Sequence, residues 1–382
     1  MSGGSASLAE WLPQDLPASA RLYLRPIGLV SGPAAASLIA AGTGRSVAGG
    51  PLAFTGCEVC IRAPGRTSRI GATLADLERW AARCGGAAEA RIASLLTRIT
   101  EPRAAPDGWD PSRPRLMGIL NVTPDSFSDG GDFTTPAAAV AQGICLAEAG
   151  ADILDIGGES TRPGAEPVAP QEEIARVLPV IKGLAAKRDA LHGARISIDT
   201  RRAAVMRAAL AAGADIINDV TALTGDPESM AVAADSRAMI MLMHMQGEPR
   251  TMNIAPSYDD VVLDVFDALE TRLEACVAAG IDRRRLVADP GLGFGKRGRE
   301  NVAVLRGLAL YHGLGVPLLL GASRKGLGDA VSGRVTPKQR LPSSLGAAMH
   351  GLDQGVQILR VHDVAETHQV LRLWERLHGF EE

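Results

Sequence analysis

From about residue 115 to the end of the chain, short apolar segments alternate with longer segments rich in alanine and leucine. This alternation indicates buried strands joined by crossover helices. The strand candidates number eight: Leu116–Leu120, Ile153–Ile156, Arg195–Ile198, Asp215–Ile217, Ala238–Met243, Leu286–Ala288, Pro317–Leu320 and Gln357–Val361. The helix candidates between them include Pro136–Gly150, Glu172–Leu184, Ala203–Ala211 and Tyr258–Ala279.

Eight strand–helix units in roughly 270 residues match a (β/α)8 barrel, which typically needs roughly 250. An open doubly wound sheet is the alternative fold, but no Gly-x-Gly-x-x-Gly turn follows the first strand candidate. We therefore predict an α/β fold, a (β/α)8 TIM barrel that is preceded by a small α+β N-terminal extension.

A proline-rich, polar stretch from Glu101 to Pro114 separates this barrel from the region before it. Such a stiff segment is typical of a domain boundary. We assign residues 1–110, with the linker from about residue 101, to an N-terminal accessory region of unknown role, and residues 115–382 to the barrel domain.

The accessory region has two strand candidates, Arg21–Ile27 and Leu52–Arg62, on either side of a segment of small residues. From Thr73 to about Ile99 the apolar spacing predicts a helix, and Thr73 with Asp76 resembles a capping box at its start. The region has no catalytic constellation, so a small accessory or interface module is its simplest interpretation.

Charge and composition exclude several classes of partner. The formal net charge is -3 and no basic block is present, so nothing indicates nucleic acid or an anionic membrane. No stretch approaches the roughly 18 apolar residues of a membrane span, and the start lacks the features of a signal peptide. We therefore expect a cytoplasmic protein.

The five cysteines are scattered, which suits free thiols in a reducing compartment. Cys57 and Cys60 have CxxC spacing, but they lie in a strand candidate, where residues three apart point to opposite faces. No second Cys or His pair lies near them in the sequence to complete a zinc site. Buried small side chains are the favoured interpretation.

Polar residues recur at or just beyond the ends of all eight strand candidates. In a barrel these ends meet at one rim, so residues far apart in the sequence line one pocket. A single Asp or Asn after a strand is often a helix N-cap, but eight such coincidences favour a site. The residues are Asn121, Asp155, Asp199, Asn218, His244, Asp289, Ser323, and Arg360 with His362.

Two glycine-bounded loops follow the first two strand candidates. The run Met117–Gly131 is an apolar segment that ends in a polar loop, which suits a segment able to fold over a ligand. The loop Gly157–Ala165 contains hydroxyls, the cation Arg162 and a stiffening proline. It can cap the pocket beside the first loop, although its composition is also that of an ordinary surface turn.

Asp199, Asn218 and Asp289 bring two acids and an amide to the predicted pocket. A flat heterocycle that carries amino and ring N–H donors, such as a pterin or a guanine-like ring, is well met by these acceptors. A general acid–base pair is the alternative, but acids on the third and sixth strands need not face each other.

Arg360 and His362 are two residues apart on the last strand candidate, so they face the same way and can bind one anion together. Loops after the seventh and eighth strands of barrels often bind phosphate. A salt-bridged arginine and a structural histidine are the alternative. With Asn121 adjacent around the closed barrel, a Mg²⁺–diphosphate complex fits, because Mg²⁺ takes one or two protein oxygens plus phosphate and water.

At these residues the chain resembles the dihydropteroate synthases, folate-pathway enzymes that join a dihydropterin diphosphate to p-aminobenzoate. The resemblance runs from about Leu116 to Val364, and the region before the linker lies outside it. The motifs that carry it are Asn121–Gly131, Gly157–Gly164, Ser197–Thr200, Ile217–Asp219, Leu242–Gln246, Asp289–Lys296, Ser323–Lys325 and Arg360–Val364.

The resemblance implies a role for each site residue. The pterin ring is expected to contact Asp199, Asn218, Asp289 and Lys325, and the diphosphate with its Mg²⁺ is expected to contact Asn121, Arg360 and His362. The p-aminobenzoate site is expected to comprise Thr161, Pro163, Phe294, Ser323 and Lys325, with Phe127 closing over it, and Arg162 is expected to be a further substrate-binding residue. Lys325, Arg360 and His362 are the residues expected to act in catalysis.

The family reaction implied is dissociative: diphosphate leaves, and the arylamine attacks the resulting pterin methylene cation. Because an arylamine is already a neutral nucleophile, no Ser-His-Asp or Cys-His arrangement is required. Sulfonamides are expected to compete with p-aminobenzoate. The alternatives are a pterin-binding methyltransferase and a catalytically silent pterin-binding paralogue, and a C₂ homodimer is the expected assembly.

Overall fold

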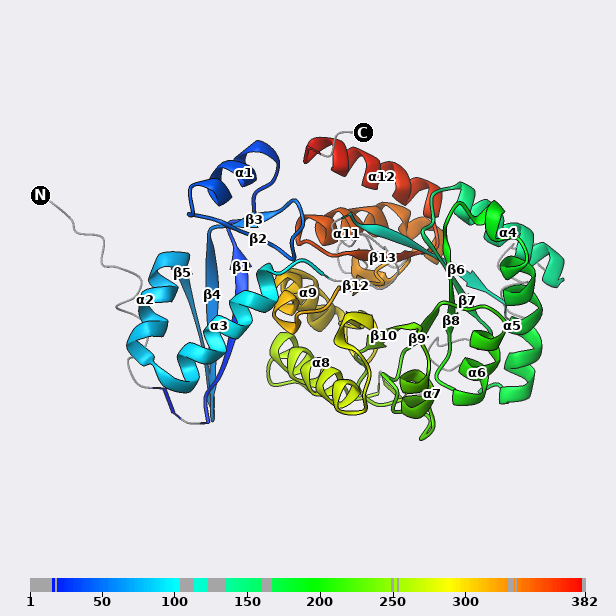
Figure 1. Ribbon diagram of the computed structural model, residues 1–382, viewed down its shortest axis with the longest axis horizontal. Helices are drawn as coiled ribbons and strands as arrows, with labels where there is room; N and C mark the ends of the chain where they lie inside the picture. The colour runs from blue at the N-terminus through cyan, green and yellow to red at the C-terminus, as the bar shows by residue number, and fades with distance from the viewer. Residues whose placement is uncertain are drawn as a thin grey trace, which may run out of the picture.

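The computed structural model describes residues 16–17, 19–103, 113–122, 135–159, 167–248, 251–252, 254–328, 333 and 335–379. An eight-stranded parallel sheet forms the centre of its C-terminal part (Figure 1). The strands are β6 Arg115–Asn121, β7 Ile153–Gly157, β8 Arg195–Asp199, β9 Ile216–Asp219, β10 Met239–Met243, β11 Leu286–Asp289, β12 Leu319–Leu320 and β13 Ile358–Val361.

These strands follow the order β11-β10-β9-β8-β7-β6-β13-β12, and an isolated parallel bridge between Ala288 and Leu318 joins the two ends. The (β/α)8 barrel is therefore confirmed. Each of the eight predicted strands is present, with bounds that differ by at most two residues.

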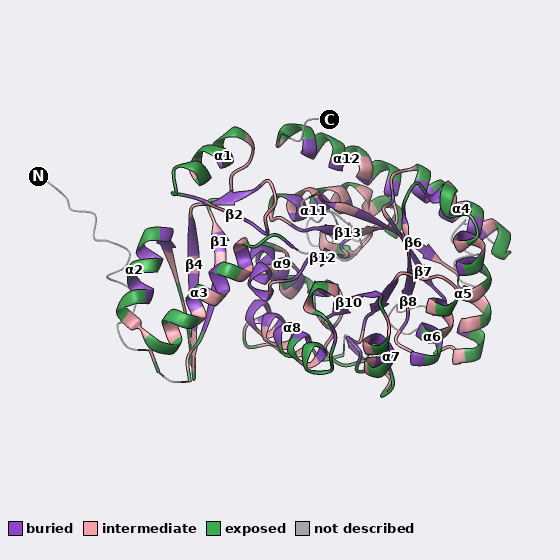
Figure 2. Cartoon of the chain, in the orientation of Figure 1, coloured by how far each residue is buried: buried purple, intermediate pink, exposed green. Residues whose placement is uncertain are grey.

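Helices surround the sheet and turn their buried faces toward it (Figure 2). They are α4 Pro136–Glu148, α5 Pro170–Ala185, α6 Ala203–Ala211, α7 Ser229–Asp235, α8 Val261–Ala278, α9 Gly298–Arg306, α11 Leu341–Asp353 and α12 Val364–Leu377. Short 3₁₀ turns lie between elements: η4 Arg188–Leu191, η5 Arg283–Arg285, η6 Leu308–Leu314, η7 Gly326–Gly328 and η8 Pro337–Arg340. Among the described residues, no helix is both long and apolar enough to cross a lipid bilayer.

One apolar layer fills the barrel interior below the carboxyl ends of the strands. Every member is at most 2% exposed: Met117, Ile153, Ile216, Met239, Met241, Val287, Leu319 and Ile358. Because side chains on a strand alternate between faces, the next inward position along each strand lies two residues further on. On β7, β9, β11 and β13 a polar residue occupies that position.

Residues 16–103, called the N-terminal module below, form a three-stranded antiparallel sheet, a two-stranded hairpin and three helices. The sheet has the order β1-β4-β5. The elements are β1 Arg21–Ile27, α1 Gly32–Ala40, β2 Arg45–Ser46, β3 Ala53–Phe54, β4 Gly56–Ala63, β5 Arg66–Thr73, α2 Leu74–Cys84 and α3 Gly86–Thr100. The expected α+β extension is present.

Four details of this module differ from the sequence prediction. The strand predicted over Leu52–Arg62 is divided into β3 and β4, which belong to different sheets. The segment of small residues contains helix α1, the strand β5 was not predicted, and the helix expected from Thr73 to about Ile99 is broken at Gly85. Gly85 has a φ of +58°, a left-handed conformation that glycine adopts readily. The predicted cap is confirmed, because the Asp76 backbone N–H donates to Thr73 Oγ1 over 3.1 Å.

Cys57 and Cys60 are both fully buried on β4, and burial raises the pKa of each thiol to about 12. A thiol that stays protonated is a poor metal ligand and a poor nucleophile. The two side chains are therefore packing residues of the module.

The N-terminal module packs directly on α8 and η6 of the barrel. The ring of Tyr23 meets the ring of Phe266 edge to face, with the centroids 5.4 Å apart. A Cβ atom at Gly313 would lie 3.1 Å from Leu95 Cδ2 and 3.2 Å from Phe266 Cε2, so α3 also approaches the barrel closely. The buried apolar residues of the module and of the outer barrel layer belong to one continuous core.

A buried histidine beside this interface predicts a pH-dependent stability. His312 is fully buried, and its Nε2 lies 2.8 Å from the carbonyl oxygen of Gln354, so Nε2 carries the proton. Burial, together with the nearby Arg103, lowers the pKa of His312 to about 3. An unfolded histidine has a pKa of about 6.5, so below that pH the unfolded state binds more protons and is favoured.

We expect wild-type protein to lose about 1.4 kcal/mol of unfolding free energy per pH unit, relative to His312→Gln, as the pH falls from 6 to 5. Urea unfolding of both proteins at several pH values measures this difference. Parallel pH profiles for the two proteins would contradict the assignment.

Candidate active site

The polar level of the barrel interior lies directly above the apolar layer. Asp155, Asn218, Asp289 and Arg360 each stand two residues after an inward apolar residue, on β7, β9, β11 and β13. These strand ends share one rim, as the sequence predicted.

Arg360 is the centre of a largely buried ionic network, in which its own side chain is 22% exposed. Its Nε donates to Asp155 Oδ2 and its Nη2 donates to Asp199 Oδ2, each over 2.6 Å. Asp155 is fully buried and also accepts from Ser197 Oγ at 2.7 Å and from Asn218 Nδ2 at 3.1 Å. The acids and the amide are therefore held in fixed orientations before any ligand binds.

The charged groups of this network shift one another's pKa values. Burial by itself lowers the pKa of Arg360, but Asp155 and Asp199 raise it above the ordinary value, so the guanidinium stays charged. Burial raises the pKa of Asp199 to about 7, against the lowering by Arg360, and Asp155 adds to the rise. The ion pair with Arg360 opposes this rise and favours the ionised carboxylate of Asp199.

A second cluster lies at the rim between β11 and β12. Asp289 accepts a hydrogen bond from the Gly291 backbone N–H at 2.7 Å. Lys325 Nζ lies 4.7 Å from the centroid of the Phe294 ring and donates to the carbonyl oxygen of Leu292. Burial lowers the pKa of Lys325 to about 8, although Asp289 opposes this.

His362 and Ser323 meet beside this cluster. Ser323 Oγ lies 3.1 Å from His362 Nδ1 and accepts the His362 backbone N–H at 3.2 Å. The serine therefore joins the end of β13 to the turn after β12.

Asn121, at the end of β6, is the candidate metal ligand. A Cβ atom at Gly157 would lie 3.5 Å from Asn121 Oδ1 and 3.7 Å from Asp199 Oδ2, so the missing side chain leaves room between the two oxygens. Among the described residues, no group of three His, Cys, Asp or Glu side chains could hold a metal ion. Mg²⁺ fits such a site when phosphate and water supply the remaining oxygens.

Residues 117–362 match the model of a family described as pterin binding enzyme. A dihydropteroate synthase of Neisseria meningitidis serogroup B is 47% identical over 270 residues, which are 69% of this chain and 93% of that one. The chain belongs to the pterin-binding enzyme family.

Solved structures agree with the family assignment. A Xanthomonas albilineans dihydropteroate synthase with 4-aminobenzoic acid has 50% identity and a TM-score of 0.66, and the match covers 71% of this chain and 95% of that one. A Yersinia pestis dihydropteroate synthase with a sulfonamide drug complex has 43% identity and a TM-score of 0.67, with 72% and 98% covered.

In this pterin-binding enzyme, the described site residues predicted from the sequence gather at the rim as three neighbouring groups. One group is Asp199, Asn218 and Arg360, another is Asp289, Phe294 and Lys325, and the third is Ser323 with His362. The predicted residues Phe127, Thr161, Arg162 and Pro163 lie outside the described residues.

The simplest expectation is that the side chains of Arg360 and His362 are both free to bind an anion. In the structure both have protein partners. Arg360 is salt-bridged to two carboxylates, which is the alternative that the sequence left open. The guanidinium has five N–H donors and these contacts engage two of its nitrogens, so anion binding stays compatible with them.

Two structural residues of the pterin-binding enzyme site were not assigned from the sequence. Asp155 stood among the residues at strand ends but received no role. An acid in the middle of the buried run Ile153–Gly157 is itself the signal, because such a charge requires a buried cation.

The other is Lys296, which is 3% exposed. Its Nζ lies 2.9 Å from His244 Nδ1 and donates to the carbonyl oxygens of Gly291, Phe294 and His244 at 2.9, 3.1 and 3.2 Å. Burial lowers the pKa of Lys296 to about 7. This lysine holds the β11 loop, Gly291–Lys296, in its closed turn.

Proposed function

We propose that this chain is a dihydropteroate synthase. It would condense 6-hydroxymethyl-7,8-dihydropterin diphosphate with p-aminobenzoate, giving 7,8-dihydropteroate and diphosphate for folate biosynthesis. The observation that carries the proposal is one rim that combines fixed acid and amide acceptors, Asp199, Asn218 and Asp289, with the partly buried cations Lys325 and Arg360. Relatives that carry this name match this chain over nearly the whole of their own length.

The acceptors would hold the pterin ring. Asp289 and Asn218 would bind its amino and ring N–H groups, with Lys325 beside a ring acceptor. Asp199 would take part in the same contact, because Arg360 engages only its Oδ2 oxygen.

Arg360 and His362 would bind the diphosphate, with Asn121 contributing an oxygen to Mg²⁺. When bound, Mg²⁺ supplies positive charge that stabilises the negative charge of the leaving diphosphate. Arg360 would stabilise the same charge with N–H donors whose positions Asp155 and Asp199 already fix.

Phe294, Ser323 and Lys325 would frame the p-aminobenzoate site, together with Thr161, Pro163 and Phe127, and Arg162 would be a further substrate-binding residue. The methylene carbon–oxygen bond would break with its electron pair going to diphosphate, and the arylamine nitrogen would form the new bond and then lose a proton. Water must be kept from the intermediate cation, which is the task proposed for the loops that contain Phe127 and Thr161. Sulfonamides would compete at this site, as the Yersinia pestis complex suggests.

The test is a coupled assay of purified full-length protein with the dihydropterin diphosphate, p-aminobenzoate and Mg²⁺. Formation of dihydropteroate with equimolar diphosphate is the expected result. Pterin binding without diphosphate release would indicate a silent paralogue, and methyl transfer from a folate would indicate a methyltransferase. Either outcome would overturn the proposal.

Asp289→Asn tests the pterin assignment. The substitution keeps the shape but removes the negative charge opposite the pterin donors and Lys325. A hydrogen bond to a charged group contributes about 1.5–3 kcal/mol, so we expect pterin affinity to fall roughly 10- to 100-fold. Calorimetric titration with the pterin measures it, and unchanged affinity would contradict the role.

Three further assignments belong to this proposal. The barrel domain would be residues 115–382, and residues 1–110 would form an accessory region. The protein would be cytoplasmic, in keeping with its five free cysteines. It would form a C₂ homodimer, the commonest closed assembly of soluble proteins, and light scattering would measure the mass of the particle.

A further inference from the structure

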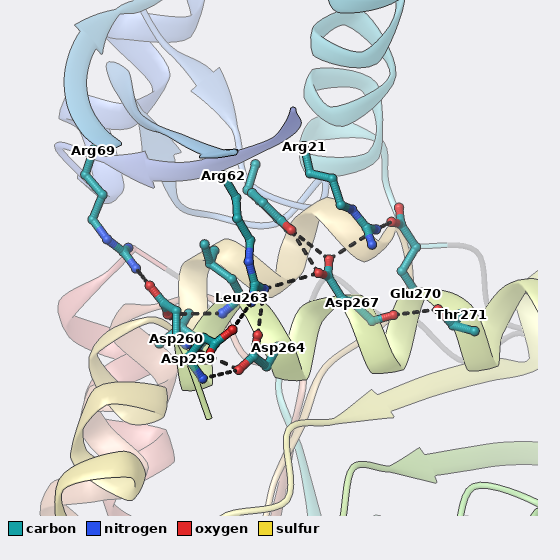
Figure 3. Close-up of polar contacts among 12 residues, drawn as sticks. Arg21, Arg62, Arg69, Asp259, Asp260, Leu263, Asp264, Asp267, Glu270 and Thr271 are labelled. Carbon is teal, nitrogen blue, oxygen red and sulfur yellow. Dashed lines mark hydrogen bonds and ion pairs between the residues drawn. The ribbon is translucent and has the colours of Figure 1, made fainter. Parts of the chain in front are cut away.

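The N-terminal module meets the barrel through an arginine-rich surface (Figure 3). Five acids lie along one face of α8 and just before it, three or four positions apart: Asp260, Asp264, Asp267, Glu270 and Glu274. Arg21, Arg91 and Arg98 all contact Glu270, at 3.1, 2.9 and 2.9 Å. Tyr23 Oη donates to the Asp267 carboxylate at 2.9 Å.

Two of these acids, Asp260 and Asp264, lie at the start of α8. Each uses one carboxylate oxygen for the backbone there and the other for an arginine of the module. Asp260 Oδ1 accepts the backbone N–H groups of Val262 and Leu263, at 3.2 and 3.3 Å, and so caps the helix. Its other oxygen, Oδ2, binds Arg69 of the module.

The two carboxylate oxygens of Asp264 also have different partners. Its Oδ2 accepts the backbone N–H groups of Asp259 and Asp260, at 3.0 and 3.2 Å, while its Oδ1 binds Arg62 Nη1 at 2.6 Å. The module thus grips the carboxylates that fix the chain entering α8.

Two residues just before α8, Ser257 and Tyr258, connect its start to the loops at the barrel rim. Tyr258 Oη donates to the carbonyl oxygen of Gly295 over 2.7 Å. The Gln246 side chain bonds to both backbone groups of Ser257, at 2.8 and 2.7 Å. Gly295 belongs to the β11 loop, which also contains Phe294, whose ring faces Lys325 Nζ.

Gly295 has no room to shift toward Gln246. A Cβ atom at this glycine would lie 2.7 Å from the Gln246 carbonyl oxygen, and its φ is +63°. Gln246 and Tyr258 therefore both adjoin the β11 loop at Gly295, while Lys296 holds the loop from within.

We propose that the N-terminal module positions the β11 loop for the arylamine, through Arg69, Asp260 and Tyr258. Arg69 acts as a positioning residue, because it touches neither substrate and works through the start of α8. The inference rests on the proposed function only in that it assigns Phe294 to the arylamine site. It gives the accessory region, which the family match does not include, a specific part in binding one of two substrates.

The experiment compares full-length Arg69→Gln, Tyr258→Phe and the double variant with two matched controls. Arg45→Gln removes an arginine that pairs with Glu78 inside the module, at 2.5 Å. Tyr311→Phe removes a buried hydroxyl that has no hydrogen-bond partner among the described residues.

Steady-state kinetics should show a rise of about fivefold in the KM for p-aminobenzoate in either single variant, the effect of one hydrogen bond. The KM for the pterin diphosphate and kcat should stay within about twofold. The double variant should resemble the single variants, since both break one connection, and Arg69→Lys should recover part of the loss. Additive effects, equal changes for both substrates, or similar changes in the controls would overturn the proposal.

Hydrogen exchange provides a readout that needs no substrate. Amides of residues 291–297 should exchange faster in Arg69→Gln and Tyr258→Phe than in wild type or the controls. Unchanged exchange there would refute the positioning role. If wild-type protein forms no dihydropteroate, the proposed function fails, while the exchange comparison still decides whether the module positions the loop.

Discussion

Arg360→Met is expected to abolish dihydropteroate formation, with a fall of at least about 10²- to 10³-fold in kcat, because the leaving diphosphate loses a fixed donor. The same change leaves Asp155 and Asp199 without their shared cation in the barrel interior. Removing one partner of a buried ion pair typically costs about 3–5 kcal/mol. Diphosphate release and thermal unfolding measure the two effects.

A second substitution separates the two effects of Arg360→Met. Adding Asp155→Asn should restore part of the lost stability, because one uncompensated carboxylate becomes neutral, but should restore no activity. Arg376→Met on the exposed face of α12 is the matched control and should change neither quantity. Full activity in Arg360→Met would remove this arginine from the proposed diphosphate site.

A chain that starts at Arg113, without the N-terminal module, is expected to be strongly destabilised. Phe266 is now fully buried against Tyr23, and exposing one such side chain costs about 1.5–3 kcal/mol. The acids of α8 would also repel one another without their arginine partners. With a total loss of about 5 kcal/mol, the melting temperature should fall by roughly 10–20 °C.

Differential scanning calorimetry of both chains tests this expectation. The full chain should unfold in one transition, because module and barrel share one core. Two separate transitions, or a barrel that melts at the same temperature alone, would show that the module is only an appendage.

The barrel could be predicted from the sequence because its strands are fully buried and read as short apolar runs, such as Met239–Met243. Strand β5 could not, because Arg66 and Thr67 are exposed and its sequence is polar at an edge. Its extended conformation comes from pairing with β4, a tertiary contact that local pattern does not encode.

The site shows the same division. The end-of-strand pattern placed Asp199, Asn218, Asp289 and Arg360 on one rim, since barrel topology makes those ends converge. It could not pair Arg360 with Asp155 and Asp199, which are 205 and 161 positions away in the sequence. That choice of partners depends on the size and curvature of the folded barrel.

The acids of α8 illustrate a further limit. Their spacing of three or four is that of an ordinary solvated helix face. Only the folded chain shows that Glu270 is 9% exposed and surrounded by three arginines.

The paired charges on α8 and the module also constrain how such a chain can change over generations. Glu270 keeps two arginine partners when one of its three is lost, whereas loss of Glu270 leaves Arg91 without its ion-pair partner on α8, so we expect substitutions of the acid to cost more than substitutions of one arginine. A barrel without acids at the α8 positions would leave the arginines of the module without their partners, so the two parts of such a hybrid would pair poorly. Module and barrel are therefore expected to be inherited as one unit.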